Sequence, residues 1–437
     1  MSIPTGLAGI LPETARVSPE DHLAIGGCDL VEIAREFGTP VYVFDEQTLR
    51  SQCRSFMGEF GSRYPDVQVL YACKAYVNTA LVRLLQDEGL GLDVVSAGEF
   101  MIARASGFPL DRTYFHGNNK TPQELELAVS MGVGRIVVDS FYELDLLDGI
   151  AASQGKRVSI LLRLSPGIDP HTHAKTTTGI IDSKFGFPIA TGQAEEAVAA
   201  ALHRRNLELV GLHSHLGSPI FEMEPYAQAL EVLFEFIQSM ESKYGFVLKE
   251  LSPGGGFAIQ YVPESPPPQI AQYAETITSC IKQFLGSRKP PRLVIEPGRS
   301  IVGRAGVALY TVGASKEVPG IRKFVSVDGG MGDNIRPAIY GSRYVAVVAN
   351  RVSAPNEEKI TLAGKYCESG DLLIEGIDMP VLNSGDLVAL PASGAYCLSM
   401  ASNYNASLRP PIVLLNDGKA RLIRRRETFE DLMRCDV

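Results

Sequence analysis

Hydrophobic and polar positions follow two different patterns along the chain. From about residue 66 to 298, short apolar runs alternate with longer amphipathic stretches, which predicts strands alternating with helices. The eight apolar runs are VQVLYA, GLDVV, TYFHG, RIVVD, VSILLRL, LELVGLHSH, LKELS and RLVIE. An open doubly wound sheet has the same alternation, but a count of eight strands favours a (β/α)8 barrel of the TIM type.

After about residue 305 the helical period disappears. Turn-separated antiparallel strands, and therefore a C-terminal all-β domain, are predicted from the runs VALYTVGAS, KFVSVDGG, RYVAVVANRV, KITLAGKYC, DLVALPA and PIVLLND. We predict a barrel at 47–305 and a β domain at 306–437. An N-terminal segment, 1–46, is expected to pack with the β domain through a helix, DLVEIAREFG, and a strand, PVYVFD. The proline-rich stretch 262–269 is predicted to be a loop within the barrel.

Composition and charge narrow the class of function. With 437 residues, 45% of them hydrophobic, the chain can form two domains with sizeable cores. Its formal net charge of -9 argues against a nucleic-acid or anionic-membrane binder, and no apolar run reaches the ~18 residues of a membrane span. Seven cysteines without a C-x-x-C pair favour free thiols over disulfides or a zinc site. The N-terminus lacks a secretion or transit layout, so we expect a cytoplasmic protein without a bound metal.

Chemically useful side chains gather at the predicted strand ends. In a (β/α)8 barrel the C-terminal ends of the strands share one mouth, and active sites lie there. The residues at these ends are Lys74, His116, Asp139, Arg163, His215, Gly254, Gly255, Gly256 and the run EPGR at 296–299. An amine, an imidazole, a glycine loop, a carboxylate and an arginine are therefore predicted to converge on one mouth.

Most of these residues also have an ordinary structural explanation. Lys74, in YACKAYVN, could be a solvated or salt-bridged charge instead of a Schiff-base nucleophile, and His215 could be a core histidine. The G-G-G run at 254–256 could be a tight turn instead of a phosphate cradle. Glu296 differs, because a carboxylate that ends an apolar strand is costly unless it is paired. A protonated pyridine nitrogen would pair it, so the set as a whole predicts pyridoxal 5'-phosphate.

Longer motifs resemble those of one enzyme family. In order and spacing, this chain is similar to the diaminopimelate decarboxylases in the motifs YACKA, GLDVVSAGE, FHGNNK, SPGIDPHTHAKTTTGIIDSKFGF, HSHLGS, PGGGF, EPGRSIVGRAG, VDGGMGDNIRPAIYG, CESGD, GAY and SNYNASLRP. These enzymes belong to the fold type III, alanine racemase-like pyridoxal-phosphate decarboxylases. The resemblance covers about residue 38 to the C-terminus. It implies head-to-tail homodimers that decarboxylate meso-2,6-diaminopimelate to L-lysine, the last step of lysine biosynthesis.

The resemblance also implies a role for each matching residue. Lys74 resembles the aldimine lysine, His215 the residue that stacks on the cofactor ring, and Glu296 the ring-nitrogen partner. Further cofactor contacts are implied for Ser218, Gly254, Gly255, Gly256, Pro297, Gly298, Arg299 and Tyr396. Substrate contacts are implied for Arg299, Arg336, Tyr340, Glu368 and Tyr396. Cys367 resembles the proton donor, and its CESGD motif is implied to reach the partner subunit's cofactor.

Three positions depart from the family pattern, and Cys367 has a competing explanation. Tyr76 and Pro219 lie beside motifs, so they affect only the expected shape of the pocket. The glycine that replaces an alanine of the family in VDGGMGD has no explanation in the sequence. Cys367 could be a small buried hydrophobe, but Glu368 and Asp371 give it a polar setting that favours a functional role.

Three other functions compete with this interpretation. A non-catalytic relative would be expected to lack Lys74 or Cys367, and both are present. Spacing alone leaves a racemase open. The nearest rival is a decarboxylase of ornithine, lysine or arginine. The arginine of NIRPAIYG disfavours that rival, because diaminopimelate ends in a second carboxylate that an arginine can pair.

Overall fold

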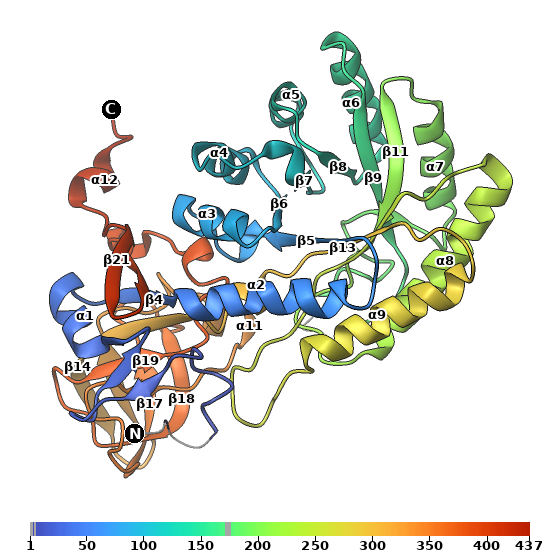
Figure 1. Ribbon diagram of the computed structural model, residues 1–437. Helices are drawn as coiled ribbons and strands as arrows, with labels where there is room; N and C mark the ends of the chain where they lie inside the picture. Colours follow the sequence, from blue (N-terminus) through green and yellow to red (C-terminus); the bar gives the residue numbers. More distant parts are fainter. Residues whose placement is uncertain (1–2, 4–5, 171–175) are drawn as a thin grey trace. The chain divides into compact units, whose positions relative to one another are not determined.

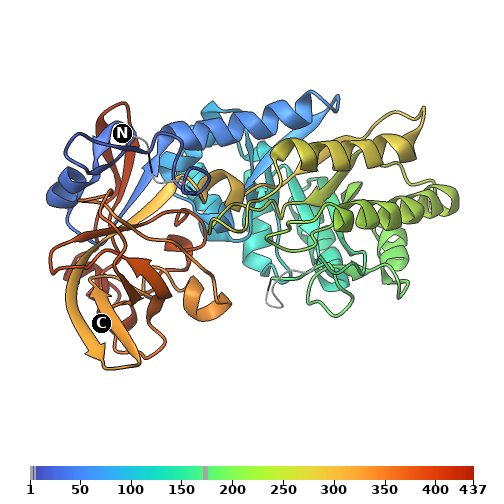
Figure 2. The same cartoon turned by 90° about the horizontal axis from the view of Figure 1, so that it is seen from below.

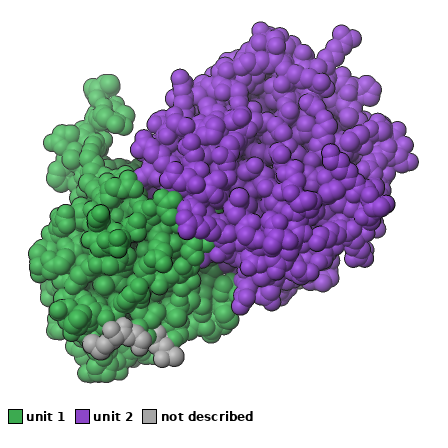
Figure 3. Space-filling view, in the orientation of Figure 1, with its two compact units in different colours: residues 1–51, 259–267, 299–437 green, residues 52–258, 268–298 purple. Residues whose placement is uncertain are grey.

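The chain forms two compact units, shown in green and purple in Figure 3. The structure, a computed structural model, describes residues 3, 6–170 and 176–437. The β unit comprises Met1–Ser51, Ile259–Pro267 and Arg299–Val437, and the barrel unit comprises Gln52–Ala258 and Pro268–Gly298. Residues 171–175, part of the motif SPGIDPHTHAKTTTGIIDSKFGF, lie outside the described residues.

A closed ring of eight parallel strands confirms the predicted (β/α)8 barrel (Figure 1). Neighbouring strands pair in parallel, and the pairings of β8 with β9 and of β13 with β5 complete the ring. The strands are β5 (Val67–Ala72), β6 (Gly91–Val94), β7 (Thr113–Phe115), β8 (Arg135–Val138), β9 (Val158–Ser165), β11 (Leu207–His213), β12 (Glu250–Gly254) and β13 (Arg292–Ile295). A short β10 (Phe187–Pro188) adds to β9. One buried cluster joins six of the strands through Leu70, Tyr114, Val137, Leu161, Val210 and Val294.

Local sequence signals explain where the barrel helices begin and end. In α5, the Thr121 side chain accepts the N–H of Glu124 while the Glu124 side chain accepts the N–H of Thr121, and Gly132 ends the helix with a φ of 74°. The helices are α2 (Glu46–Gly61), α3 (Thr79–Asp87), α4 (Ala97–Ala105), α5 (Pro122–Met131), α6 (Phe141–Ser153), α7 (Gln193–His203), α8 (Glu224–Tyr244) and α9 (Ile270–Leu285). Helices α8 and α9 pack side by side (Figure 2). No helix in the described part of the chain is long and apolar enough to cross a bilayer.

The β unit is built on a sheet with an N-terminal strand near its middle. Its order is β18-β17-β15-β14-β4-β20-β21, and β19 pairs with both β14 and β16. The strands are β4 (Val41–Asp45), β14 (Gly306–Val318), β15 (Arg322–Val327), β16 (Val347–Val348), β17 (Glu358–Ala363), β18 (Leu372–Met379), β19 (Leu387–Leu390), β20 (Ile412–Asn416) and β21 (Lys419–Arg424). Strand β4 therefore shares a hydrophobic core with C-terminal strands, through Val43, Leu309 and Val413.

Smaller elements complete the β unit. A separate three-stranded sheet of β1 (Arg16–Val17), β2 (Leu23–Ile25) and β3 (Cys28–Asp29) precedes α1 (Leu30–Phe37), the predicted N-terminal helix. The other helices are α10 (Arg299–Val302), α11 (Arg336–Tyr340) and α12 (Phe429–Met433).

Three predicted features of the β unit are wrong in detail. The sheet is mixed, because β15 pairs with β17 and β20 pairs with β4 in parallel. The run RYVAVVANRV contributes only the two-residue β16. The proline-rich stretch belongs largely to the β unit, because Ile259 joins Ile10 and Ala392 in a hydrophobic cluster and Glu264 forms an ion pair with Arg343.

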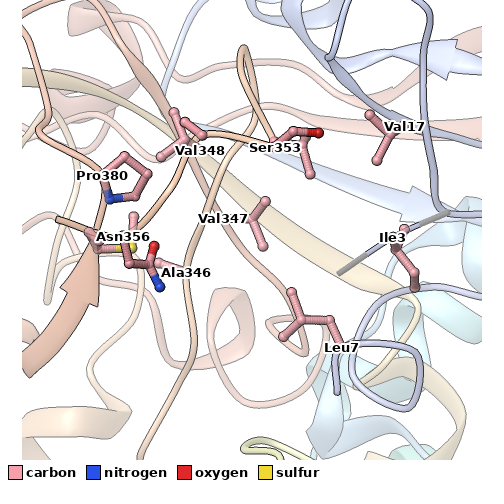
Figure 4. A pocket seen from close by; sticks show the side chains of 12 residues that line it. Ile3, Leu7, Val17, Ala346, Val347, Val348, Ser353, Asn356 and Pro380 are labelled. Carbon is pink, nitrogen blue, oxygen red and sulfur yellow. The ribbon is translucent and has the colours of Figure 1, made fainter. Parts of the chain in front are cut away.

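A cavity of about 470 Å³ lies within the β unit (Figure 4). Its lining side chains are mostly apolar, and they include Ile3, Leu7, Val347, Val348 and Pro380. Among the described residues that line this cavity, none is predicted for the active site and none has a titratable side chain. The cavity is therefore separate from the chemistry described next.

Candidate active site

The residues predicted for the active site fall into two sets, one in each unit. The barrel unit holds Lys74, His215, Ser218, Gly254, Gly255, Gly256, Glu296, Pro297 and Gly298. The β unit holds Arg299, Arg336, Tyr340, Cys367, Glu368 and Tyr396. In the barrel unit, every member of the set lies at or just beyond the C-terminal end of a strand.

Lys74 lies in a single helical turn, Cys73–Ala75, that directly follows β5. Its side chain is 40% exposed, and its Nζ lies 3.6 Å from an oxygen of Asp93, near the C-terminal end of the adjacent strand β6. Asp93 is fully buried, and within the described residues neither of its oxygens accepts a hydrogen bond. Burial raises the pKa of Asp93, while the ammonium of Lys74 opposes that rise. The sequence interpretation did not single out Asp93.

Glu296 directly follows β13, and each of its carboxylate oxygens accepts a hydrogen bond. The Ser252 hydroxyl donates to Oε1 at 2.8 Å, and Nε2 of His213 donates to Oε2 at 3.1 Å. Burial disfavours the charged carboxylate, but the neighbouring His213 imidazole and these hydrogen bonds hold the pKa of Glu296 well below its usual range. The structure therefore keeps a buried, ionised carboxylate at the strand ends, as pairing with a protonated pyridine nitrogen requires.

His116 links Asp93 to Glu296. Its Nε2 lies 3.7 Å from a carboxylate oxygen of each. Burial holds the pKa of His116 well below its usual range, so the ring is neutral. The donor atoms of His116, His213 and Glu296 lie within 4.8 Å of one another, a spacing that a metal ion could also use. The expectation of a metal-free site thus stays a prediction.

His215 is fixed in one orientation beyond the end of β11. Its Nδ1 accepts the N–H of Gly255 at 3.3 Å, and its carbonyl accepts the Thr178 hydroxyl at 2.7 Å. Burial and the nearby Lys74 ammonium hold the pKa of His215 well below its usual range. The ring is therefore neutral and carries its proton on Nε2, a form suited to stacking on an aromatic cofactor.

The three glycines at 254–256 have no room for side chains. A Cβ at Gly254 would meet the Ser214 carbonyl oxygen, and one at Gly256, whose φ is 105°, would meet the Gly217 carbonyl oxygen. The N–H groups of Gly254 and Gly255 donate to Ser252 and His215, whereas that of Gly256 has no acceptor among the described residues. Close packing against the neighbouring backbone therefore requires glycine here, and the free N–H of Gly256 fits a phosphate oxygen.

Arg163 and Asp139 connect the barrel mouth to the segment after β9. Asp139 accepts the N–H of Gly186 at 2.9 Å and lies 3.8 Å from Nε of Arg163. The Arg163 guanidinium lies 4.3 Å from the centre of the Phe185 ring. These contacts position residues 185–186, so the strand-end pair Arg163 and Asp139 has a clear structural role.

In the β unit, Tyr261 brings together two predicted substrate-binding arginines. Its hydroxyl accepts a hydrogen bond from Arg299 at 2.8 Å, and the Arg336 guanidinium lies 4.6 Å from its ring centre. Arg299 also lies 4.8 Å from the centre of the Tyr396 ring. Tyr396 has a φ of 60°, a left-handed conformation that is strained for tyrosine and often marks functional sites. Tyr261 was not singled out from the sequence.

Arg336 is buried without an acidic partner. It is 5% exposed, begins α11 and donates a hydrogen bond to the Tyr344 hydroxyl. Within the described residues, no carboxylate lies at ion-pair distance from it. A buried cation of this kind is suited to receive an anionic group of a ligand. Tyr340, at the C-terminal end of α11, is partly exposed.

Cys367 and Glu368 lie on an exposed loop between β17 and β18. The Cys367 N–H donates to the Asn405 side chain at 2.9 Å, and the Glu368 N–H donates to the Tyr366 carbonyl at 2.8 Å. The structure therefore does not bury Cys367 as a packing residue.

A buried carboxylate, Asp333, holds the loop that leads to Arg336. It accepts hydrogen bonds from the hydroxyls of Tyr42, at 2.9 Å, and Tyr310, and from the N–H of Gly330 at 3.0 Å. Burial raises the pKa of Asp333 to about 6, although the tyrosine hydroxyls oppose the rise. Folding therefore favours the protonated form of this carboxyl.

This shift predicts a pH-dependent stability. Because the folded pKa lies above the unfolded value, the contribution of Asp333 is fully present below about pH 4 and is lost as the pH rises through 6. Relative to Asp333→Asn, the wild type should lose about 3 kcal/mol of unfolding free energy between pH 4 and 7. Urea unfolding of both proteins across this range tests it. A difference that does not change with pH would contradict the assignment.

The chain is similar to a known family model and to named relatives. Residues 46–303 match the family model described as pyridoxal-dependent decarboxylase, pyridoxal binding domain. The diaminopimelate decarboxylase of Bacillus subtilis (strain 168) is 45% identical over 427 residues, which cover 97% of this chain and 97% of that protein.

Solved structures of related decarboxylases are also similar to this chain. The crystal structure of diaminopimelate decarboxylase from M. jannaschii in co-complex with L-lysine has a TM-score of 0.92 at 33% identity, covering 97% of this chain and 98% of that one. The lysine/ornithine decarboxylase from Vibrio vulnificus, complexed with putrescine, has a TM-score of 0.76 at 25% identity, covering 89% and 98%. The similarity is thus greater to the structure named for diaminopimelate than to the one named for lysine and ornithine.

Proposed function

We propose that this chain, which belongs to the diaminopimelate decarboxylase family of pyridoxal-dependent decarboxylases, removes CO2 from meso-2,6-diaminopimelate to form L-lysine. One observation carries the proposal: the amine of Lys74 and the ionised carboxylate of Glu296 lie at the ends of adjacent strands, linked through Asp93 and His116 at 3.6 and 3.7 Å. An amine nucleophile and a carboxylate for the pyridine nitrogen are the two groups that pyridoxal 5'-phosphate requires.

The residues of the barrel are proposed to bind the cofactor. Lys74 Nζ would hold its aldehyde carbon, neutral His215 would stack on its ring, and Glu296 would keep its ring nitrogen protonated. The phosphate would be bound by Ser218 and the glycines 254–256. Further contacts would come from Pro297 and Gly298 of the barrel unit and from Arg299 and Tyr396 of the β unit. When bound, pyridoxal 5'-phosphate supplies an electron sink for the electron pair that remains on the α-carbon as CO2 leaves.

The residues of the β unit are proposed to bind the substrate and to supply a proton. Arg336 would pair with the distal carboxylate, Glu368 would pair with the distal ammonium, and Arg299, Tyr340 and Tyr396 would contact the substrate. Cys367 Sγ would give its proton to the α-carbon after CO2 has left. The predicted bounds are 47–305 for the cofactor-binding domain and 1–46 with 306–437 for the β domain, whereas residues 47–51, 259–267 and 299–305 belong to the β unit.

One assay tests the proposed reaction. Purified protein is incubated separately with meso-diaminopimelate, ornithine, lysine and arginine, and the products are identified by mass. We expect L-lysine and CO2 from meso-diaminopimelate and little product from the basic amino acids. Cadaverine, putrescine or agmatine as the main product would instead support the alternative, a decarboxylase of basic amino acids. Loss of α-carbon configuration without CO2 release would indicate a racemase.

We further propose a homodimer with shared active sites, in the cytoplasm. The exposed position of Cys367 and Glu368 supports the sharing, because a proton donor must be shielded from solvent to act selectively, and a partner subunit can supply that cover. The seven cysteines are all free thiols, which supports a reducing compartment.

Shared sites predict complementation between two inactive variants. Lys74→Ala and Cys367→Ala proteins should each be inactive, but a mixed dimer contains one site with both residues intact. Such dimers should recover up to about half of wild-type activity. Mixed dimers are isolated with two different affinity tags and assayed with meso-diaminopimelate. No recovery in confirmed mixed dimers would contradict a shared site.

A further inference from the structure

Two loops of the β unit carry the groups proposed to act on the substrate. The first, residues 329–335, leads directly into α11 and therefore to Arg336. The second, residues 364–371, connects β17 to β18 and carries Cys367 and Glu368. The N–H of Lys365 in the second loop donates to the carbonyl of Gly329 in the first at 3.0 Å, so the two loops are in direct contact.

The Asp371 carboxylate joins these loops. One of its oxygens accepts the N–H of Met331 in the first loop at 2.6 Å, and the other accepts the N–H of Tyr366 in the second at 2.8 Å. The backbone carbonyl of Asp371 also accepts the N–H of Gly364 at 2.9 Å, which closes the second loop on itself. Asp371 is only 3% exposed, although Cys367 and Glu368 on the same loop are exposed.

The Asp371 carboxylate occupies space that two glycines leave open. A Cβ added at Gly330 or at Gly364 would overlap the Asp371 carboxylate oxygens. Gly330 also has a φ of 144°, whereas Gly364 has an ordinary backbone conformation. Because one glycine lies on each loop, both loops approach the carboxylate more closely than any other residue would allow.

We infer that Asp371 is a positioning residue that holds both loops, and so sets the placement of Cys367 and Glu368 on one loop and of Arg336 after the other. A buried carboxylate with one backbone donor from each loop fixes the spacing between them, and a small misplacement of reacting groups costs up to about 100-fold in rate. The inference rests on the proposed function, because it assigns Asp371 to the placement of the loop that carries the proton donor and of the loop that leads to the receptor for the distal carboxylate, whichever subunit's site each group serves.

Two variants should disturb the contacts between Asp371 and the two loops. One changes the Asp371 carboxylate, and the other changes a glycine that packs against it. Asp371→Asn keeps the shape but turns an amide N–H toward one of the backbone donors. Gly364→Ala pushes on the carboxylate without altering it. In both variants, kcat with meso-diaminopimelate should fall about 10- to 100-fold. The ratio of kcat/KM for meso-diaminopimelate to kcat/KM for lysine should also decrease. Amide exchange at Met331 and Tyr366 should accelerate. In a protein that already carries Arg336→Ala, adding Asp371→Asn should not change the preference for meso-diaminopimelate over lysine further. The reason is that Asp371 affects this preference by placing Arg336, which is then absent.

Asp386→Asn is the matched control. Asp386 is also buried in the β unit, at 8% exposure, and accepts the N–H of Asn383 at 2.7 Å, but it contacts neither loop. Its variant should lower the thermal midpoint and leave kcat and substrate preference within about twofold of wild type. The inference is overturned if Asp371→Asn and Gly364→Ala keep kcat and substrate preference as close to wild type as this control does. It is also overturned if the double variant of Asp371 and Arg336 changes the substrate preference by the sum of the two single effects. Should Asp371→Asn fail to fold, Gly364→Ala alone decides. A wild type that does not decarboxylate meso-diaminopimelate would overturn the proposed function instead.

Discussion

Lys74→Ala is expected to abolish covalent attachment of pyridoxal 5'-phosphate and to lower decarboxylation by on the order of 10³-fold or more. The amine that anchors the cofactor and exchanges with the substrate amine is then absent, whereas Glu296 and its donors remain in place. Borohydride reduction of the wild type, followed by peptide mapping, should fix the cofactor on the peptide that contains Lys74. Label on any other lysine would contradict the assignment.

A second lysine of the barrel unit provides a sharp control. Lys120 follows β7, but its side chain is 1% exposed and its ammonium donates to Gly117 at 2.9 Å, to Val137 at 2.7 Å and to Glu143 at 2.7 Å. Each of its three protons has an acceptor, so it cannot serve as a free amine nucleophile. Borohydride should therefore leave Lys120 unlabelled, and Lys120→Met should lower stability without preventing attachment at Lys74.

The main architecture could be predicted because its signals are local. Each barrel strand is a short apolar run with a helix-forming stretch after it, and the count of eight such units specified the closed ring. The parallel pairing of β20 with β4 could not be predicted, because the two strands are far apart in the sequence and their run pattern does not reveal pairing direction. For the same reason, the attachment of residues 259–267 to the β unit became visible only through tertiary contacts.

A residue of the candidate site was predictable where its charged side chain stands in an apolar run, because burying an unpaired charge there costs free energy. Glu296 was recognisable because it ends an apolar strand. The same rule applies to Asp93 within GLDVV, so the sequence did contain a signal for this residue. Ser252 and Tyr261 act through partners distant in the sequence, and no local pattern marks them. His213 lies within the motif HSHLGS, but its contact with Glu296 was not predicted. The proposed roles that came from resemblance are therefore strongest where an independent physical reason exists.

Substrate choice rests on the chemistry around Arg336. Diaminopimelate ends in both an ammonium and a carboxylate, whereas lysine has the same chain length without that carboxylate. Arg336 is held by the Tyr344 hydroxyl and the Tyr261 ring, neither of which neutralises it. A distal carboxylate can form a bidentate, charge-assisted pair with this guanidinium. Binding lysine would instead leave a buried cation without a counter-ion.

Arg336→Ala should therefore erase most of the substrate preference. An unsatisfied buried partner costs on the order of 3 kcal/mol, or about two decades in specificity, so wild-type protein should strongly prefer meso-diaminopimelate over lysine and ornithine. The variant should lose activity on meso-diaminopimelate and change little on the simple diamino acids, as measured by kcat/KM for each. Arg343→Ala, which removes a 69% exposed arginine paired with Glu264, is the matched control and should keep the preference. If Arg336→Ala kept wild-type discrimination, Arg336 would not be the receptor for the distal carboxylate, and specificity would have to come from other groups of the site.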